Sequence, residues 1–143
     1  MTVRVGIVGL GFMGVTHYRA YKEIAGAQVV AVADTDDARR AGDWSKVGGN
    51  FGGGSGQEDL SGIKAYRDAD DLFADPGIDL VDICLPTEFH PSSAIAALEA
   101  GKNVQVEKPI ALTVEEADQM LAAAKKAGKL MMALNLDRAA RDM

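Results

Sequence analysis

Three glycines near the amino terminus are the first residues whose spacing suggests chemistry. Gly9, Gly11 and Gly14 follow a short apolar run and precede a stretch that can form a helix. A turn of this kind points backbone N–H groups and the positive end of a helix at an anion. Gly9 would make the tight turn, Gly11 would let the backbone approach a pyrophosphate, and Gly14 would let helix and strand pack closely. Phe12 and Met13, inside the motif, are predicted to contact the same ligand.

An acidic residue stands at the distance that such a motif requires. Asp34 lies about 20 positions after Gly14, at the end of a second apolar run. A carboxylate there can accept hydrogen bonds from the adenosine ribose, and it repels the 2′-phosphate that distinguishes NADP from NAD. The sequence therefore predicts NAD as the cofactor, although Arg39 and Arg40 nearby leave NADP open.

The elements that must position these residues alternate along the chain. Strands are predicted at 3–8, 28–34, 63–67, 78–86, 103–108 and 129–134, and helices at 13–25, 68–74, 91–101 and 114–127, with a short helix within 34–44. Buried strands that alternate with helices pair in parallel through right-handed crossovers. Two halves of three strands predict one α/β domain, a doubly wound Rossmann fold with strand order 3-2-1-4-5-6.

Local signals refine two segments. Thr113 and Glu116 form a capping box for the helix 114–127, which Gly128 should end. The segment 48–56 holds six glycines in nine positions and is expected to form a mobile loop. The apolar face of the helix 114–127 is predicted to consist of Ala117, Met120, Leu121 and Ala124.

The composition excludes several classes of protein. A net charge of -6 without any Lys/Arg-rich run argues against nucleic-acid binding. No apolar run is long enough for a membrane span, and the chain enters a strand at once, which leaves no room for a secretion signal. The single cysteine, Cys84, excludes an internal disulfide, so a cytoplasmic location is expected. The aspartates at 34–37 and 68–71 are interpreted as turn and helix-start signals, and no metal site is predicted.

Two further polar stretches lie at the same edge of the predicted sheet as the glycine turn. "CLPTEFH" (84–90) follows the fourth strand and "VEKPIALT" (106–113) follows the fifth. Open parallel sheets bind their ligands at the carboxyl ends of the strands. Both stretches are therefore candidate parts of one site.

Together with the glycine turn, these stretches resemble the NAD(P)-binding domain of the glucose–fructose oxidoreductase/inositol dehydrogenase (Gfo/Idh/MocA) family. The resemblance rests on "GIVGLGFMGVTH", Asp34, "DLVDICLPTEFHPSSAIAALEAGKNV", "EKP" and "TVEEADQMLAAAKKAG", which cover nearly the whole chain. The Glu-Lys-Pro after the "PTxxH" stretch is far more specific than the glycine motif. The family has the fold that the strand pattern predicts.

The resemblance implies roles for individual residues. Leu85, Pro86 and Thr87 would line the cofactor beyond the pyrophosphate, and His90 would lie near its nicotinamide half. Glu107 and Lys108 would face the nicotinamide ribose and the substrate, with Lys108 as the candidate catalytic residue that positions or polarises the reacting oxygen. The peptide bond between Lys108 and Pro109 is often cis in the family.

Plainer interpretations of the same residues remain open from sequence. Lys108 could be a solvated lysine at a strand end, and His90 could cap the following helix. His17 is interpreted as a packing or surface residue. Cys84 is interpreted as an inert small hydrophobe, since nothing basic adjoins it in the sequence to stabilise a thiolate.

The chain departs from the family at its end. Members continue into a second domain that supplies the substrate pocket and usually a histidine acid/base, whereas this sequence stops at Met143. We expect a cofactor domain at 1–136 and a polar tail at 137–143, in a truncated or redesigned chain that binds the dinucleotide with little turnover. A small sugar-like substrate is expected only for a complete enzyme. The alternatives are a nucleotide-sensing or interaction module, or an engineered scaffold, and the face left by the second domain could mediate self-association.

Overall fold

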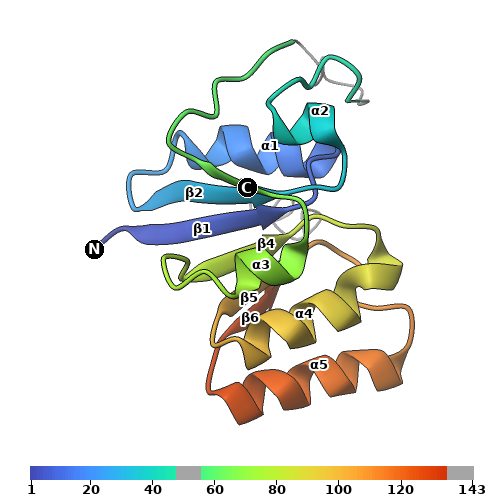
Figure 1. Ribbon diagram of the computed structural model, residues 1–143. Helices are drawn as coiled ribbons and strands as arrows, with labels where there is room; N and C mark the ends of the chain where they lie inside the picture. The colour runs from blue at the N-terminus through green and yellow to red at the C-terminus, as the bar shows by residue number, and fades with distance from the viewer. Residues whose placement is uncertain (48–55, 135–143) are drawn as a thin grey trace, which may run out of the picture.

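The computed structural model describes residues 1–47 and 56–134, and it has one six-stranded parallel sheet (Figure 1). The strand order is β3-β2-β1-β4-β5-β6, which confirms the predicted doubly wound topology. All five neighbouring pairs of strands are parallel. The strands are β1 (Val3–Val8), β2 (Ala27–Ala33), β3 (Lys64–Tyr66), β4 (Leu80–Ile83), β5 (Asn103–Val106) and β6 (Met131–Ala133).

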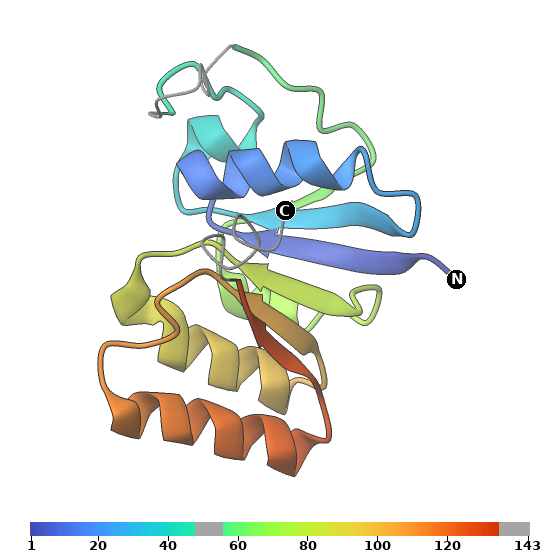
Figure 2. The same ribbon diagram turned by 180° about the vertical axis from the view of Figure 1, so that it is seen from behind.

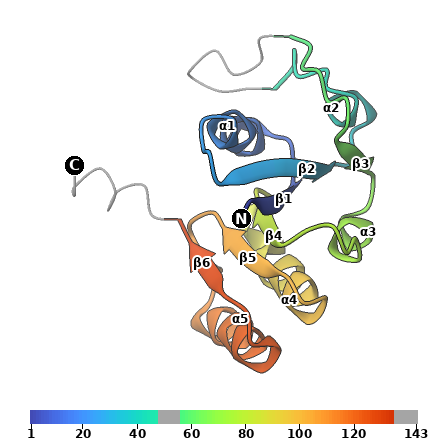
Figure 3. The same ribbon diagram turned by 90° about the vertical axis from the view of Figure 1, so that its left-hand side faces the viewer.

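Helices cover the two faces of the sheet unequally. Helices α1 and α2 lie on one face, and α3, α4 and α5 lie on the other, as the view along the sheet shows (Figure 3). The same layers are visible from behind (Figure 2). The helices are α1 (Phe12–Tyr21), α2 (Asp37–Arg40), α3 (Ala69–Phe73), α4 (His90–Glu99) and α5 (Val114–Ala127), with a 3-10 turn η1 at Thr87–Phe89.

Each face of the sheet packs its own hydrophobic core. On the α1 side, Trp44 is fully buried, donates its indole N–H to the Arg39 carbonyl at 2.9 Å and meets Tyr18 edge to face at 5.1 Å. On the other side, Leu98 of α4 and Met120 of α5 are fully buried against the sheet. These two cores hold the helices against the sheet, at whose carboxyl edge the predicted site residues lie.

The local signals at α5 are confirmed. The Thr113 hydroxyl accepts a hydrogen bond from the Glu116 amide at 3.1 Å, and Gly128 ends the helix at φ +66°. The prediction that Leu121 lies on the buried face is wrong, because this side chain is 54% exposed. Leu121 lies one residue, about 100° around the helix, from the buried Met120.

Several predicted elements are shorter in the structure, among them the first helix and the fourth strand. The first helix ends at Tyr21 instead of residue 25, and β4 spans Leu80–Ile83 instead of 78–86. After Ile83 the chain leaves the ladder and forms the loop at the carboxyl edge of the sheet, which is where ligand-facing residues are needed. The predicted loop at 48–56, apart from Gly56, and the predicted tail at 137–143 lie outside the described residues. Within the described residues, no helix is long and apolar enough to cross a membrane.

Asp75 connects β3 to the turn before β4 and offers a test of this framework. Its buried carboxylate accepts hydrogen bonds from the Gly77 amide at 2.8 Å, from the Tyr66 hydroxyl at 2.8 Å and from Lys64 at 3.1 Å. The Gly77 amide, with the other two donors, lowers the pKa of Asp75 to about 2. This contribution to stability is therefore present above the ordinary carboxyl pKa and is lost as the pH falls toward 2.

We predict that Asp75→Ala lowers the free energy of unfolding at pH 7 by about 2 kcal/mol, because it leaves donors of the turn unpaired. Urea unfolding at pH 7 and pH 3 measures the effect, which should shrink at the lower pH. Asp118→Ala is the control, since Asp118 is an exposed residue of α5. Equal losses for the two variants would contradict the role given to Asp75.

Candidate functional site

The glycine turn between β1 and α1 is tightly packed inward and open outward. A Cβ atom at Gly14 would lie 1.8 Å from the Gly9 carbonyl oxygen, so only glycine fits there. Gly9 itself has φ +95°, a conformation that other residues rarely adopt. A Cβ atom at Gly11 would meet nothing within 4 Å, and Gly11 begins α1 without a side-chain cap. The turn therefore presents backbone amides of a helix start to an open surface, the arrangement that binds a pyrophosphate.

Asp34 is fixed beside this turn. Its Oδ2 accepts a hydrogen bond from the Leu10 amide at 2.8 Å, and its Oδ1 accepts one from the Asp36 amide at 2.8 Å. The carboxylate is thus oriented by the backbone before any ligand arrives, which reduces the entropy cost of binding. Its place at the end of β2 is the one that the sequence predicts.

A cavity of about 310 Å³ lies next to Asp34 and the glycine turn. This volume is at the lower end of small-ligand pockets. Its walls are mainly apolar, with the carboxylate of Asp34 and the guanidinium of Arg67 as the charged groups. The lining residues are Val8, Gly9, Ala33, Asp34, Thr35, Arg67, Ala69, Leu85, Phe89 and Ser93.

The loop after β4 contributes the next set of predicted residues. Leu85 is half-buried and lines the cavity, Thr87 is half-buried in η1, and Pro86 is exposed. Phe12 and Met13, at the start of α1, are half-buried. These residues therefore lie along the carboxyl edge of the sheet from the glycine turn outward.

His90 occupies a different environment from its neighbours. Its ring is 1% exposed, and its two nitrogens lie 2.9 Å from the Pro109 carbonyl oxygen and 2.8 Å from that of Leu85. The helix α4 begins at His90 with Phe89 as its N-cap, so His90 does not cap the helix. The imidazole instead joins the loop after β4 to the loop after β5.

Lys108 and Glu107 differ in their exposure to solvent. Lys108 is exposed at the end of β5, and its bond to Pro109 is cis. Glu107 is only 8% exposed, and its Oε1 lies 2.5 Å from His17 Nε2. That oxygen makes no aligned hydrogen bond in the part of the chain that the structure describes, so the contact is an ion pair.

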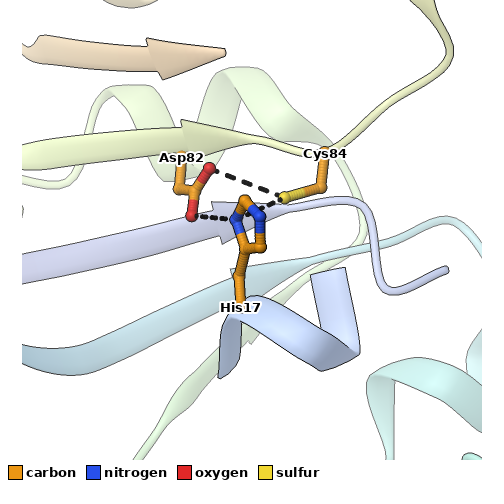
Figure 4. A group of neighbouring side chains, drawn as sticks. All are labelled: His17, Asp82 and Cys84. Carbon is orange, nitrogen blue, oxygen red and sulfur yellow. Dashed lines mark hydrogen bonds and ion pairs between the residues drawn. The ribbon is translucent and has the colours of Figure 1, made fainter. Parts of the chain in front are cut away.

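Glu107 belongs to a buried cluster of polar side chains that the sequence did not reveal, and Figure 4 shows three other members, His17, Asp82 and Cys84. His17 Nδ1 lies 2.7 Å from Asp82 Oδ2, which also accepts a hydrogen bond from the Tyr21 hydroxyl at 2.8 Å. Asp82 is fully buried. The one available signal was Asp82 itself, because an acid inside a strand buried on both faces requires a partner.

Asp82 and Glu107 determine the protonation of His17. Burial lowers the pKa of His17, but the hydrogen bond and charge of Asp82, together with Glu107, outweigh burial, so the pKa lies above its ordinary value. Because each ring nitrogen faces a carboxylate oxygen, the doubly protonated ring satisfies both. The charged form of His17 is thus favoured, and the interpretation of His17 as a packing or surface residue missed its pairing with the two carboxylates.

Cys84 also belongs to this cluster. Its Sγ lies 3.4 Å from His17 Nδ1, so a basic group does adjoin it in space although none does in sequence. Burial raises the pKa of the Cys84 thiol, and Asp82 raises it further. The thiol therefore stays protonated. His17, Asp82 and Cys84 place three potential metal ligands within 4.8 Å of one another, but the imidazole and the carboxylate are already paired.

The glycine turn, the anchored aspartate and the strand-end loops define a dinucleotide-binding Rossmann domain. A model of the family described as "Oxidoreductase family, NAD-binding Rossmann fold" (Gfo/Idh/MocA) matches residues 3–134, and the chain belongs to this family. The assignment agrees with the resemblance found in the sequence.

Individual relatives are similar along most of this chain. Inositol 2-dehydrogenase 1 of Saccharopolyspora erythraea is 39% identical over 123 residues, which are 85% of this chain and 33% of that protein. Biliverdin reductase of Synechocystis, solved with biliverdin and NADP+, has a TM-score of 0.77 at 30% identity, over 94% of this chain and 38% of its own. The WlbA dehydrogenase of Chromobacterium violaceum, solved with NADH and UDP-GlcNAcA, has a TM-score of 0.77 at 27% identity, over 93% and 35%. The chain thus spans about a third of the length of these relatives.

Gly14, which is tightly packed, and Gly11, which is open to solvent, give a matched pair of variants in the glycine turn. We predict that Gly14→Ala lowers the free energy of unfolding by about 3 kcal/mol or more, because its Cβ would collide with a backbone oxygen. Gly11→Ala should leave stability nearly unchanged but weaken NAD+ binding by about tenfold or more, because its methyl group occupies the surface that the pyrophosphate approaches. Thermal unfolding and calorimetric titration measure the two effects. Unimpaired NAD+ binding by Gly11→Ala would rule out this approach surface.

The raised pKa of His17 sets a pH dependence of stability. A raised pKa means that the contribution of His17 is fully present below pH 6.5 and is lost as the pH rises through the folded-state value. We predict that His17→Gln costs about 3 kcal/mol at pH 6, since it leaves buried carboxylates unpaired. In urea unfolding from pH 6 to pH 9, the difference in the free energy of unfolding between the wild type and the variant should become smaller. A difference that stays constant over this pH range would contradict the raised pKa of His17.

Proposed function

We propose that this chain is the cofactor-binding part of an NAD-dependent oxidoreductase that acts on a sugar or polyol. The observation that carries the proposal is the glycine turn, closed at Gly14 and open at Gly11, with the Asp34 carboxylate fixed beside it. These residues fit a dinucleotide. The name of the Saccharopolyspora relative, an inositol dehydrogenase, supports a polyhydroxylated substrate for the complete protein.

The residues of the chain have distinct parts in this proposal. The amides from Gly9 to Gly14 would hold the pyrophosphate, and Asp34 would hold the adenosine ribose in the adjoining cavity. Leu85, Pro86 and Thr87 would continue the binding surface. When bound, the cofactor supplies a nicotinamide that accepts or donates a hydride. Lys108 would contact the nicotinamide ribose and orient the reacting oxygen of the substrate.

The preference for NAD over NADP follows from the surroundings of Asp34. The carboxylate would repel a 2′-phosphate, and Arg40 is engaged through Nη1 with the Asp34 carbonyl at 2.9 Å and through Nη2 with Asp37 at 2.5 Å. Both of these bonds oppose a turn of Arg40 toward a 2′-phosphate. The solved relatives include complexes with NADP+ and with NADH, so local residues and not the family set the preference.

Turnover requires more than this domain. Hydride transfer needs a substrate held close to the nicotinamide in an oriented site from which water is excluded. Relatives extend well beyond the matched third, and we propose that this further part of such proteins supplies the substrate pocket. The chain by itself should therefore bind NAD+ with little or no oxidation of substrate.

The free thiol of Cys84 supports a reducing compartment such as the cytoplasm.

A second candidate is an interaction module that assembles with another copy of the chain. The specific observation is the edge strand β6, next to which Leu130 is 68% exposed and in which Met132 is 49% exposed. An exposed edge strand with apolar side chains is a surface for pairing. A mass measurement in solution with and without NAD+ distinguishes this candidate, which requires a change of assembly on binding.

We predict that calorimetric titration detects saturable binding of NAD+ and at least tenfold weaker binding of NADP+, with the factor of about ten corresponding to one lost charge-assisted hydrogen bond. Asp34→Ala should weaken NAD+ by about tenfold or more and reduce the discrimination against NADP+. Asp36→Asn is the control, because it lies two residues away and keeps a side-chain oxygen for the amide of Arg39. If neither nucleotide binds to the wild type, the proposed function is wrong.

A further inference from the structure

The turn that carries Lys108 is held on both sides by a buried histidine. On the amino-terminal side, Glu107 contacts His17 at 2.5 Å. On the carboxyl-terminal side, the Pro109 carbonyl oxygen lies 2.9 Å from His90 Nδ1. Lys108 is exposed, while both histidines are at least nine-tenths buried. The sequence contains two histidines, and both make these contacts.

Each histidine ties the turn to a separate part of the fold. His17 projects from α1, three residues after Gly14, and its other nitrogen contacts Asp82 in β4 at 2.7 Å. His90 begins α4, and its other nitrogen contacts the Leu85 carbonyl oxygen at 2.8 Å. The glycine helix and the loop after β4 are thereby linked to the Lys108 turn.

Both imidazoles have oxygen acceptors at both nitrogens. A neutral imidazole has one N–H and can satisfy one acceptor, whereas the doubly protonated ring donates to two. For His17 the acceptors are carboxylates, and for His90 they are backbone carbonyls. The two carboxylates around His17 therefore favour its doubly protonated form, and each of the two rings bridges two segments of the chain at once.

We propose that His17 and His90 are positioning residues that clamp the turn at Glu107–Pro109 and so aim Lys108 at the nicotinamide half of the cofactor. The proposal rests on the proposed function, because the cofactor gives the lysine its target. A lysine has a long and flexible stem, so its aim depends on how firmly its backbone is held. The clamp acts before and after the lysine, which restricts both displacement and rotation of the turn.

The clamp also makes the position of the Lys108 turn depend on pH. The groups that face His17 are Asp82 of β4, Cys84 directly after β4 and Glu107 after β5, and Tyr21 of α1 donates to the same Asp82 oxygen that faces His17. Loss of a proton from His17 removes the positive charge between the two carboxylates and leaves one ring nitrogen without a hydrogen to donate. The aim of Lys108 should therefore loosen as the pH rises above the range in which His17 is charged.

The experiment compares two nucleotides on the isolated chain. ADP carries the adenosine and a pyrophosphate but no nicotinamide riboside, so the ratio of NAD+ affinity to ADP affinity reports the half that Lys108 would contact. We expect His17→Gln and His90→Gln each to lower this ratio by about tenfold, the worth of one hydrogen bond to a charged group. ADP binding should change by less than about twofold. Because ADP itself titrates at about pH 6, the test is the difference between the proteins: the ratio should fall further between pH 6 and pH 9 for the wild type than for His17→Gln.

Tyr21→Phe is the matched control. It removes a hydrogen bond to Asp82 inside the same cluster but leaves the contact between His17 and Glu107 in place. Its ratio should equal that of the wild type. The clamp would be overturned if the histidine variants lost equal affinity for NAD+ and for ADP. It would also be overturned if the ratio of the two affinities fell as far in Tyr21→Phe as in the histidine variants.

A measurement without nucleotide separates failure of the clamp from failure of the proposed function. If neither NAD+ nor ADP binds to the wild type, the proposed function fails, and nuclear magnetic resonance still decides the clamp. The wild type at pH 7 should show both nitrogens of His17 protonated, and the order parameter of the Lys108 amide should fall in His17→Gln but not in Tyr21→Phe. A singly protonated His17, or an unchanged order parameter in His17→Gln, would overturn the clamp. The glutamine variants must first be shown to fold, and the protonation state of the wild type remains decisive if they do not.

Discussion

The structure depends on the close approach of α1 to the end of β1. Gly14 lies so near the Gly9 carbonyl that no side chain fits between them. This contact brings the start of the helix to the carboxyl edge of the sheet, where its amides face outward. The same contact places His17, one turn further along α1, over β4. A methyl group at Gly14 would push α1 away from β1, and both the outward-facing amides and the position of His17 over β4 would be lost.

A buried charge cluster lies directly beneath this ligand-facing edge. Isolated charges in a protein interior are costly, but here an imidazole stands between two carboxylates and the Tyr21 hydroxyl completes the set. Breaking one contact would leave a carboxylate without compensation. Such a network resists displacement of its members, and Glu107, the member that adjoins Lys108, extends that resistance to the edge of the sheet.

The division of the site between rigid and exposed parts is consistent with a cofactor domain that works with a further region. The residues that would hold the adenosine and the pyrophosphate are anchored within this chain, through Leu10, Asp34 and the glycine turn. Lys108, by contrast, is exposed after the end of β5. The relatives to which this chain is similar are about three times as long as the matched region.

The sequence by itself determined the order of the strands, the glycine turn, the partner aspartate at 34 and the limits of α5. Each of these depends on local patterns, such as apolar runs, glycine spacing and the capping box at Thr113. The tertiary structure alone decided that β4 stops at Ile83, that Leu121 is exposed and that Cys84 has a basic neighbour. It also decided the charge cluster, because His17 and Asp82 are 65 positions apart and meet only when α1 packs on the sheet. A contact at that separation follows from the geometry of packing, and no local pattern of residues encodes it.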